Sequence, residues 1–412
     1  MTTYLICTDG TNGDVYPFVR LGQELARRGH ETILYTHQHY VATAEQAGLR
    51  CVATDTEERY AIQLADGRHL VHNVLADVDN VVDFYTRNGV FDQIRAEYTA
   101  MADVVRHRPP GSVVVLGRHT SRLSVLMLRE AYGVPAAWVA VSPAQFLALP
   151  VAERMIPASL GGPIDEMRAA AGLPPLTDWA GWLSTVDLLL ALWPGWFDTA
   201  GPASPPAATL TGFVLHDDGE TGELPPGVAD LVAGPEPPVL VTGGSSPLLH
   251  ADWYRVAAEA CARAGRRSIL VCRHRGLLPD PLPDGAFWYP ALPFRTLMPR
   301  VAAVVHHGGV LTGARAVASG VPQLVLAYGA DRPDNARRLR RLGVAEWLPS
   351  VRWGPAEVTA QLRLVLDDPG YRRRAAALAS SVDSAAAVAA TCDRLESLGD
   401  RQCIPRPAVV SP

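Results

Sequence analysis

The sequence predicts an α/β protein of two Rossmann-like domains that face each other across a cleft. Its 412 residues exceed what one hydrophobic core comfortably serves and suit two domains of about 200 residues each. Short β-rich runs alternate with helical lengths in both halves, which indicates parallel strands joined by crossover helices. A stretch rich in Pro, Gly and acidic residues separates the two series, as a surface linker would.

The first domain is expected over residues 1–215. A helix is predicted from Tyr16 to Arg28, where an apolar periodicity stops at Gly29. The strand candidates are continuous apolar runs rather than alternating patterns, which is typical of a sheet covered on both faces. They are Thr3–Thr8, Glu31–Thr36, Ser112–Gly117 and Ala136–Val141.

The linker is expected over residues 216–236, the second domain over 237–398 and a loosely ordered tail over 399–412. Open α/β sheets bind ligands beyond the carboxyl ends of their strands, so the cleft is the predicted site. The segment from Ala148 to Trp196 is rich in Pro, Trp and Leu, and we expect an irregular insertion that lines an apolar pocket. The strands predicted for the second domain are Val239–Thr242, Ser268–Cys272, Phe287–Pro290, Ala303–His306 and Gln323–Ala327.

Composition and charge exclude several classes of function. Hydrophobic residues make up 48% and charged residues 19%, as in globular proteins, and a net charge of −5 gives no field that attracts nucleic acid. No apolar run approaches the roughly 18 residues that span a bilayer, and the longest, such as Leu188 to Trp193, have the length of a strand. The N-terminus enters a strand without a visible secretory signal. We therefore expect a cytoplasmic protein without a membrane span, with a homodimer as one option.

All 37 basic residues are arginine, and the sequence contains no lysine. Pyridoxal-phosphate enzymes need a lysine for the Schiff base, and P-loop NTPases and protein kinases need one beside the phosphates, so these classes are excluded. Any phosphate must be bound by backbone N–H groups, hydroxyls, His or Arg. The six cysteines form no CxxC pair and have no His at zinc-ligand spacing, which indicates reduced, mostly buried residues.

The strongest local signal is the His-His-Gly-Gly motif of residues 306–309, between a predicted strand and a helix expected from Thr312 to Ser319. The glycines permit close backbone approach. A helix N-terminus presents unpaired N–H groups and a positive dipole end, which suit a diphosphate. A plain Gly-rich turn with satisfied histidines would show the same local pattern.

Two longer blocks resemble a known family. HHGGVLT followed by SGVPQLVLAYGADRPDNA is similar, in order and spacing, to the HHGGAGT, AGVPQ, DQ and Asn-Ala elements of nucleotide-sugar-dependent glycosyltransferases. These belong to the two-domain GT-B type, family 1, with antibiotic, sterol and plant secondary-product enzymes. Near the N-terminus, GTNGDVYPFVRLGQELARRGHE resembles the family's GSxGDVxPxxALxxxLxxRGHE. The resemblance covers Tyr4 to Leu49 and Val239 to Pro349.

The resemblance implies a site for the diphosphate of the donor. His307 and Thr312 would contact it, and the backbone amides of Gly308 and Gly309 would approach it. Ser245, in the turn after the first strand of the second domain, would reach the phosphates from the other side. The simpler interpretation of Ser245 is an ordinary turn serine.

The resemblance also implies sites for the nucleobase and the sugar. The segment from Phe287 to Leu292 would border the base, with Leu292 in its apolar wall. Asp331 would accept hydrogen bonds from sugar hydroxyls, with Arg332 beside the sugar. Alternatively, Asp331 only caps the helix that begins near Pro333.

The expected catalytic base is Asp14. Inverting transfer needs a base that takes the acceptor proton while the diphosphate leaves, and the family members that read GDV have Asp at this position. Asp14 could instead cap the helix that begins near Tyr16, and both roles can coexist.

Acceptor contacts are expected from Gly13 in the same loop, from His119 at a strand end, and from Trp138. A structural role is the alternative for His119. His37 and His39 follow the second strand, and we expect a surface or loop role for both.

Three positions depart from the family pattern. Leu311 and Gly313 replace a small and a hydroxyl residue in the phosphate turn, although a Leu side chain can point away while its N–H still donates. Arg332 replaces Gln and carries donors only, so it favours an unusual or charged sugar or else pairs with Asp334. Most of the other arginines of this helix are expected on a solvated face.

The predicted function is inverting transfer of a sugar from a UDP- or TDP-sugar to a hydroxyl or ring nitrogen of a small hydrophobic natural product. No cofactor and no metal are expected, because the helix N-terminus neutralises the diphosphate and no DxD-type pair lies beside the motif. The alternatives are a degenerate auxiliary partner of another transferase and a sugar-nucleotide epimerase. A nicotinamide-dependent enzyme is disfavoured because the first loop lacks G-x-G-x-x-G.

Overall fold

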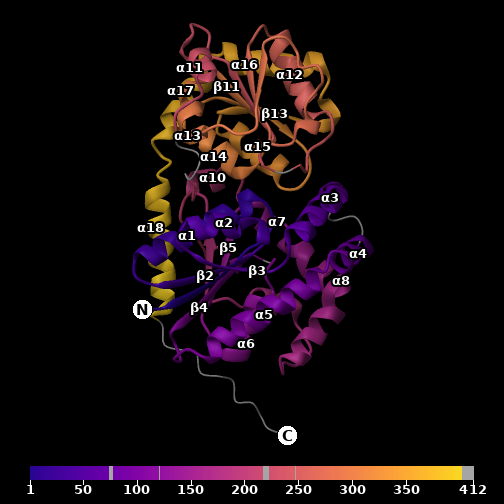
Figure 1. Cartoon of the computed structure of the whole chain (residues 1–412), viewed down its shortest axis with the longest axis vertical. Coiled ribbons are helices and arrows are strands. Elements are labelled where there is room, and N and C mark those ends of the chain that lie inside the picture. Colours follow the sequence, from indigo (N-terminus) through magenta and orange to yellow (C-terminus); the bar gives the residue numbers. More distant parts are fainter. Residues whose placement is uncertain (74–77, 120, 217–221, 246, 401–412) are drawn as a thin grey trace.

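The computed structural model describes residues 1–73, 78–119, 121–216, 222–245 and 247–400 and, among these, the side chains outside 68–81. The chain forms two lobes stacked along the long axis of the molecule, each built around a parallel sheet (Figure 1). The predicted fold class, α/β with two Rossmann-like domains facing each other, is confirmed.

The first lobe contains a seven-stranded parallel sheet of order β3-β2-β1-β4-β5-β6-β7. Its strands are β1 (Thr3–Cys7), β2 (Glu31–Thr36), β3 (Arg50–Ala53), β4 (Val113–Arg118), β5 (Ala136–Ala140), β6 (Leu188–Ala191) and β7 (Ala208–Leu210). Its helices are α1 (Asn12–Arg27), α2 (Val41–Gln46), α3 (Glu57–Asn73), α4 (Val78–Arg87), α5 (Val90–Arg106), α6 (Ser124–Tyr132), α7 (Ala144–Leu147), α8 (Leu149–Ala170), α9 (Trp179–Leu183) and α10 (Gly195–Thr199), with a 3₁₀ turn η1 (Gln38–Tyr40).

The second lobe contains a six-stranded parallel sheet of order β10-β9-β8-β11-β12-β13. Its strands are β8 (Val239–Thr242), β9 (Ser268–Val271), β10 (Ala286–Tyr289), β11 (Ala303–His306), β12 (Gln323–Ala327) and β13 (Ala345–Pro349). Its helices are α11 (Pro226–Ala233), α12 (Trp253–Arg263), α13 (Phe294–Leu297), α14 (Val310–Ala318), α15 (Arg332–Arg341), α16 (Pro355–Asp367) and α17 (Pro369–Ala379), with 3₁₀ turns η2 (Arg275–Leu277), η3 (Met298–Arg300) and η4 (Ser350–Arg352).

The continuous apolar strands are explained by helices on both faces of each sheet. In β1, Tyr4 and Ile6 pack into the core under α1, whereas Leu5 and Cys7 pack into the core under α5 and α6. Successive residues of a strand point to opposite faces, so both sets must be apolar. All nine predicted strands are present, within one residue of their predicted bounds.

Four strands were not predicted: β3, β6, β7 and β13. Three of them, β3, β7 and β13, lie at sheet edges, where one side of the strand is uncovered. Partial exposure removes the apolar run that identifies a central strand, so their sequences look like loops.

The prediction of an irregular insertion from Ala148 to Trp196 is wrong. Most of its first half is α8, a helix of 22 residues that contains three prolines: Pro150 in the first turn and Pro157 and Pro163 in the interior. Leu160, Ile164 and Met167 repeat at helical spacing and pack on the first sheet, so burial of this face outweighs the prolines.

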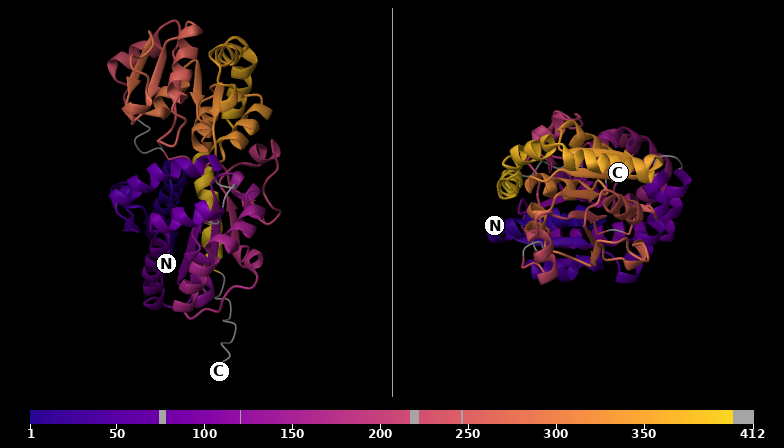
Figure 2. Two further views of the ribbon diagram at one scale, coloured as in Figure 1. Left: turned by 90° about the vertical axis from the view of Figure 1, so that its right-hand side faces the viewer. Right: turned by 90° about the horizontal axis from the view of Figure 1, so that it is seen from above.

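The final helix α18 (Ser384–Gly399) corrects the predicted boundary of the second domain at residue 398. It leaves the second lobe and runs alongside the first, as Figures 1 and 2 show. Val388, Cys392 and Leu395 are buried there in the core under α1. The first lobe is therefore completed by the carboxyl-terminal end of the chain.

An apolar cluster joins the lobes beside the cleft. Trp193, Phe197 and Phe213 of the first lobe pack in one core with residues of α14 and α15, such as Ala314 and Leu339.

No single described helix is long and apolar enough to cross a membrane; α17 and α18 reach that threshold only as a pair, which is bent by 43°.

Candidate active site

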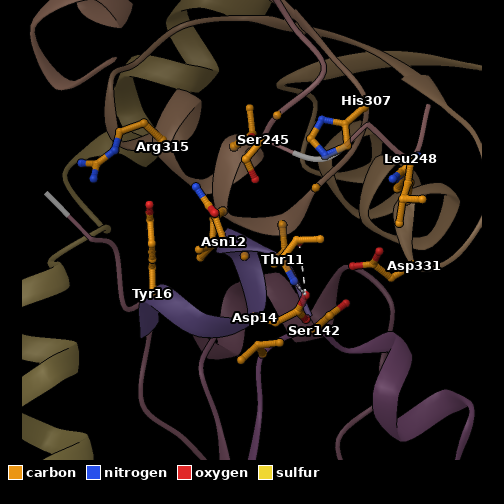
Figure 3. Close-up of a pocket in the computed structure, with 18 of the residues that line it drawn as sticks. Thr11, Asn12, Asp14, Tyr16, Ser142, Ser245, Leu248, His307, Arg315 and Asp331 are labelled. Carbon is orange, nitrogen blue, oxygen red and sulfur yellow. Dashed lines mark hydrogen bonds between the residues drawn. The ribbon is translucent and has the colours of Figure 1, made fainter. Parts of the chain in front are cut away.

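A cavity of about 750 Å³ lies between the carboxyl ends of the two sheets. Both sheets reverse strand order there, between β1 and β4 in the first lobe and between β8 and β11 in the second. The carboxyl ends of these four strands and the segments that follow them supply residues to the cavity, among them Asp14, Arg118, Ser245 and His307. Figure 3 labels Asp14, Ser245 and His307. The predicted location of the site in the cleft matches this cavity.

The turn between β11 and α14 forms one wall of the cavity. Gly309 is the N-cap of α14, and no side chain caps this helix. The amides of the first turn, at Val310, Leu311 and Thr312, have no intrahelical acceptor, and these three residues line the cavity. The helix therefore presents N–H donors and its positive dipole end to whatever the cavity binds.

His307 lies in a slot between two glycines. A Cβ atom at Gly309 would come within 2.6 Å of the His307 Nε2 atom, and one at Gly244 within 2.7 Å of its Cε1 atom. Burial, and then the nearby Arg332 charge, lower the pKa of His307 well below its usual value. The ring is therefore neutral at physiological pH, and Figure 3 shows it directed towards the cavity.

His306 and Gly308 shape the turn without lining the cavity. The His306 Nε2 atom bonds the Gln323 side chain at 2.9 Å, and its Nδ1 atom accepts from the Gly308 amide at 3.1 Å. The amide of Gly308 is thus occupied, which contradicts the prediction that it approaches the diphosphate. Gly308 instead permits a φ of 98° and close packing on Arg332.

The two departures in this turn have local explanations. Leu311 packs its side chain on the apolar cluster that joins the lobes, which leaves its amide at the cavity. Gly313 faces the interior, where an added Cβ would meet Leu339 at 3.0 Å, so a hydroxyl residue there would not face the cavity.

Ser245 and Leu292, which were predicted to bind the donor, both line the cavity. Ser245 lies in the turn after β8, which ends at Thr242, and Figure 3 shows Ser245 and His307 in the same wall of the pocket. Of the segment predicted to border the base, Pro290, Ala291 and Leu292 line the cavity, whereas Phe287 and Trp288 are partly exposed elsewhere on β10.

Asp331 and Arg332 enter the cavity at the start of α15. Asp331 stands at the N-cap but makes no capping hydrogen bond; its Oδ2 atom accepts from the Asn335 side chain at 2.8 Å. Arg332 is buried and donates to the Tyr328 carbonyl at 3.0 Å, while Asp334 pairs with Arg338 at 2.7 Å, so the proposed Arg332–Asp334 pair is absent.

The loop before α15 is under backbone strain. Ala330, which also lines the cavity, has a φ of 50°, the one positive φ among the described non-glycine residues. Such strain is kept where the surrounding structure fixes a functional geometry. Of the other arginines of α15, Arg337, Arg340 and Arg341 are exposed, as expected for most of this run. Arg338 is the exception, buried against Asp198 and Phe197.

Asp14 is the third residue of α1, and its carboxylate serves both the helix and the cavity. Its Oδ2 atom accepts from the Thr11 amide at 2.9 Å, which is a capping contact, and its Oδ1 atom accepts from the Arg118 Nη1 atom at 2.9 Å. Burial raises the pKa of Asp14, Arg118 opposes this, and the charges of Asp9 and Asp331 raise it further. Asp14 and Asp331 thus face the same space from different lobes (Figure 3).

The acceptor-side predictions have mixed outcomes. Gly13 and His119 line the cavity, whereas Trp138 does not. Trp138 is buried in the core on one face of the first sheet, where its Nε1 atom donates to the Leu183 carbonyl at 3.0 Å. Burial and Arg118 lower the pKa of His119 to about 4.

Of the two predicted options, a surface or a loop role, His37 has the loop role, between β2 and η1. It is buried, bonds Asp55 through Nδ1 at 2.6 Å, and accepts from the Gly10 amide through Nε2 at 3.1 Å. It therefore supports the loop that carries Asp14. His39 is the more exposed of the two histidines, as expected.

Sequence reasoning missed several residues that line the cavity. Arg118 ends β4, and Arg315 lies one turn into α14, where its Nη2 atom donates to the His216 carbonyl at 3.2 Å. Tyr16 and His216 also line the cavity, with their ring centroids 4.4 Å apart. Because the chain has no lysine, the arginines at strand ends and early in the helix after the His-His-Gly-Gly motif were the sequence signal that could have identified these cavity residues.

Two features bear on cofactors and redox state. Among the described residues, no group of three or more His, Cys, Asp or Glu side chains is arranged to hold a metal ion. The five described cysteines are free, and all but Cys51 are buried, as predicted; Cys403 lies outside the described residues.

The fold and the cavity define a two-lobed α/β enzyme that binds its ligand between the carboxyl ends of two parallel sheets. A family model described as the C-terminal domain of erythromycin biosynthesis protein CIII-like proteins matches residues 269–398. O-mycaminosyltylonolide 6-deoxyallosyltransferase of Streptomyces fradiae is 31% identical over 420 residues, covering 95% of this chain and 96% of the relative. The chain belongs to the nucleotide-sugar-dependent GT-B glycosyltransferases of family 1, in the antibiotic and natural-product group, and is an enzyme of the hexosyltransferase type.

Solved structures agree with this fold. CalG4, the calicheamicin glycosyltransferase, superposes with a TM-score of 0.72 at 20% identity, covering 97% of this chain and 98% of its own. The glycosyltransferase VinC, solved in complex with dTDP, superposes with a TM-score of 0.69 at 21% identity, covering 97% of this chain and 100% of its own.

Proposed function

We propose that the protein is an inverting glycosyltransferase that moves a sugar from a TDP- or UDP-sugar to a small hydrophobic acceptor. The observation that carries the proposal is the pair of opposed walls: helix N-terminal amides and His307 in one lobe, and the Asp14 carboxylate in the other. This pair matches the two needs of the reaction, a site for the leaving diphosphate and a base for the nucleophile.

The diphosphate belongs at the α14 N-terminus. The first-turn amides, the Thr312 hydroxyl, His307 and Ser245 all offer donors there, and Arg315 adds positive charge one turn along the helix. Pro290, Ala291 and Leu292 supply an apolar wall for the base. Because VinC was solved with dTDP, TDP is the first nucleotide to test.

Asp14 takes the proton of the acceptor hydroxyl or ring nitrogen. As the nucleophile bonds to the anomeric carbon, the bond from that carbon to the diphosphate oxygen breaks on the opposite face, which inverts the anomeric centre. Asp331 accepts hydrogen bonds from the sugar hydroxyls. Gly13, His119 and the apolar residues Val141 and Ala148 border the acceptor side.

The neutralisation of the leaving group needs no metal in this scheme, because helix amides and arginines provide it. Turnover is therefore expected to be unchanged within about 2-fold by EDTA at a concentration that strips divalent cations, since each invoked donor is protein-borne. TDP release from TDP-glucose is the readout. Loss of turnover in EDTA with recovery on adding Mg²⁺ would contradict metal independence.

The experiment for the whole proposal is an assay of TDP or UDP release with a panel of phenols, hydroxyanthraquinones and macrolactones. The anomeric configuration of the product is read by NMR. Inversion with a hydrophobic acceptor supports the proposal, and retention of configuration would overturn it.

Asp14→Asn tests the base. Turnover should fall about 10²-fold or more while TDP affinity stays within about 2-fold, because the amide cannot accept the proton but keeps the shape of the side chain. Equal losses in turnover and TDP affinity would assign Asp14 to capping α1 instead.

A further inference from the structure

Arg118 holds two carboxylates at once. Its Nε and Nη2 atoms lie 3.0 and 2.9 Å from the Asp9 Oδ1 atom, and its Nη1 atom lies 2.9 Å from the Asp14 Oδ1 atom. Asp9 thus takes two of the three contacts and Asp14 only one. Arg118 and Asp14 line the cavity, whereas Asp9 is not among the lining residues.

Asp9 is fixed in this position from other sides. The Ser121 hydroxyl donates to its Oδ1 atom at 3.1 Å, and the Arg122 Nη1 atom lies 3.5 Å from its Oδ2 atom. Arg122 is itself paired with the buried Glu97. Asp9 is therefore the principal counter-charge of Arg118.

The charges of this cluster leave one carboxylate in excess. Arg118 and Arg122 face Asp9, Asp14 and Glu97, so two positive charges meet three negative ones. Glu97 and Asp9 take the closest and most numerous contacts. Asp14, which lines the cavity, has the fewest contacts with the two arginines and is the least neutralised of the three carboxylates.

The backbone at Gly10 allows the first loop to pack closely against the Asp14 carboxylate. Gly10 has a φ of 105°, and a Cβ there would come within 2.6 Å of the Asp14 Oδ2 atom. The loop thus wraps closely around the Asp14 carboxylate, which keeps its side chain about one quarter exposed, towards the cavity.

We propose that Asp9 and Arg118 are positioning residues that set the orientation and the basicity of Asp14. Arg118 holds the Asp14 carboxylate in place through one hydrogen bond, and Asp9 occupies the rest of the guanidinium so that Asp14 remains a competent base. The inference rests on the proposed role of Asp14 as the base. Asp9 is not among the residues that line the cavity, and it acts on Asp14 through Arg118 and through its own charge.

The titratable and charged groups around the two carboxylates are defined. Asp14 is faced by Arg118 of β4, by Asp9 of its own loop, by Tyr40 and Tyr60, and by Asp331 from the second lobe. Asp9 is faced by Arg118, Arg122, His37 and Tyr85. Burial acts to raise the pKa of Asp9, but Arg118 and Arg122 outweigh it and lower that pKa, so Asp9 stays charged over the working pH range.

Opposite substitutions should move the pH profile in opposite directions. A base is active when deprotonated, so turnover falls as pH drops through its pKa. In Asp9→Asn the full charge of Arg118 acts on Asp14, and the acidic limb of turnover should move down by about one pH unit. In Arg118→Gln the Asp14 carboxylate loses its cation, and the limb should move up by about one unit.

Single-turnover TDP release from TDP-glucose, with an acceptor active in the panel above, gives these profiles directly. Plateau rates should fall roughly 3- to 30-fold in both variants, with the KM for TDP-glucose within about 2-fold. The double variant, Asp9→Asn with Arg118→Gln, removes both charges together. Its limb should return to within about 0.3 unit of the parent, because the two effects on Asp14 oppose each other.

Asp92→Asn is the matched control, since Asp92 also pairs with an arginine, Arg95, but on the exposed face of α5. Its profile should coincide with that of the parent. Limbs that stay fixed, or that move the same way in both single variants, would overturn the inference. If Asp14→Asn keeps near-parent turnover, the base assignment itself fails, which is a distinct result.

Discussion

At the scale of single residues, the site depends on the absence of side chains as much as on their presence. Gly244 and Gly309 form the slot for the His307 ring, and Gly308 lets the turn pack on Arg332. The glycines of the motif at residues 306–309 therefore do two things: they leave room for the His307 ring, and they place backbone amides at the start of α14. Only one of its two histidines, His307, faces the cavity.

Gly309→Ala should weaken TDP binding about 10-fold, which is roughly 1.4 kcal/mol. The backbone at Gly309 has a φ of −61°, which alanine accepts, so the effect comes from the new Cβ that displaces His307. Calorimetric titration with TDP measures it. Gly162→Ala, where a Cβ meets nothing within 4 Å, is the control and should leave the affinity unchanged. Parent-like binding by Gly309→Ala would show that His307 does not contact the nucleotide.

Some of the site was readable from sequence because motif order fixes it. His307, Thr312 and Asp331 come from the quoted family blocks, and Ser245 and Leu292 from the wider resemblance; all five line the cavity. Trp138 was misassigned because nothing in the sequence tells which face of β5 a strand residue occupies.

The residues around Asp14 were not predictable in the same way. Arg118 is more than a hundred positions away from Asp14, and only the pairing of β1 with β4 brings them together. Asp9 lies in the first loop, just before the N-terminal family block, and no sequence pattern marks it. Contacts of this kind depend on tertiary structure and leave no periodic signal.

At the scale of elements, α14 and α18 carry the main lessons. The phosphate helix begins two residues before its predicted start, so the first-turn amides include Val310 and Leu311. The predicted boundary of the second domain is wrong because the sequence of α18 shows that one face of the helix is apolar, but not which lobe that face packs against. Helical periodicity identifies the face of a helix that is buried, but not the element against which that face packs.

Leu395→Ala should destabilise the protein by about 2–5 kcal/mol, because Leu395 is fully buried between α18 and the first lobe. Urea unfolding monitored by circular dichroism measures the change. Arg394→Ala, on the exposed side of the same helix, should stay within about 0.5 kcal/mol of the parent. Equal stability of all three proteins would mean that α18 does not complete the first lobe.

At the scale of the whole molecule, function follows from how the two lobes are joined. The apolar cluster of Trp193, Phe197 and Phe213 with α14 and α15 holds the lobes together beside the cleft. The leaving-group site and the base lie on opposite walls of the cavity. Neither lobe alone holds both, so the proposed reaction requires the complete pair.

The central claim is that a nucleoside diphosphate binds at the α14 N-terminus, opposite Asp14. Calorimetric titration of TDP and UDP in EDTA-containing buffer tests it most directly, with the parent protein, His307→Ala and Asp14→Asn side by side. The account predicts that the parent binds at least one of them, that His307→Ala binds it roughly 10-fold or more weakly, and that Asp14→Asn binds it like the parent. Absence of binding by the parent, or equal binding by His307→Ala, would contradict it.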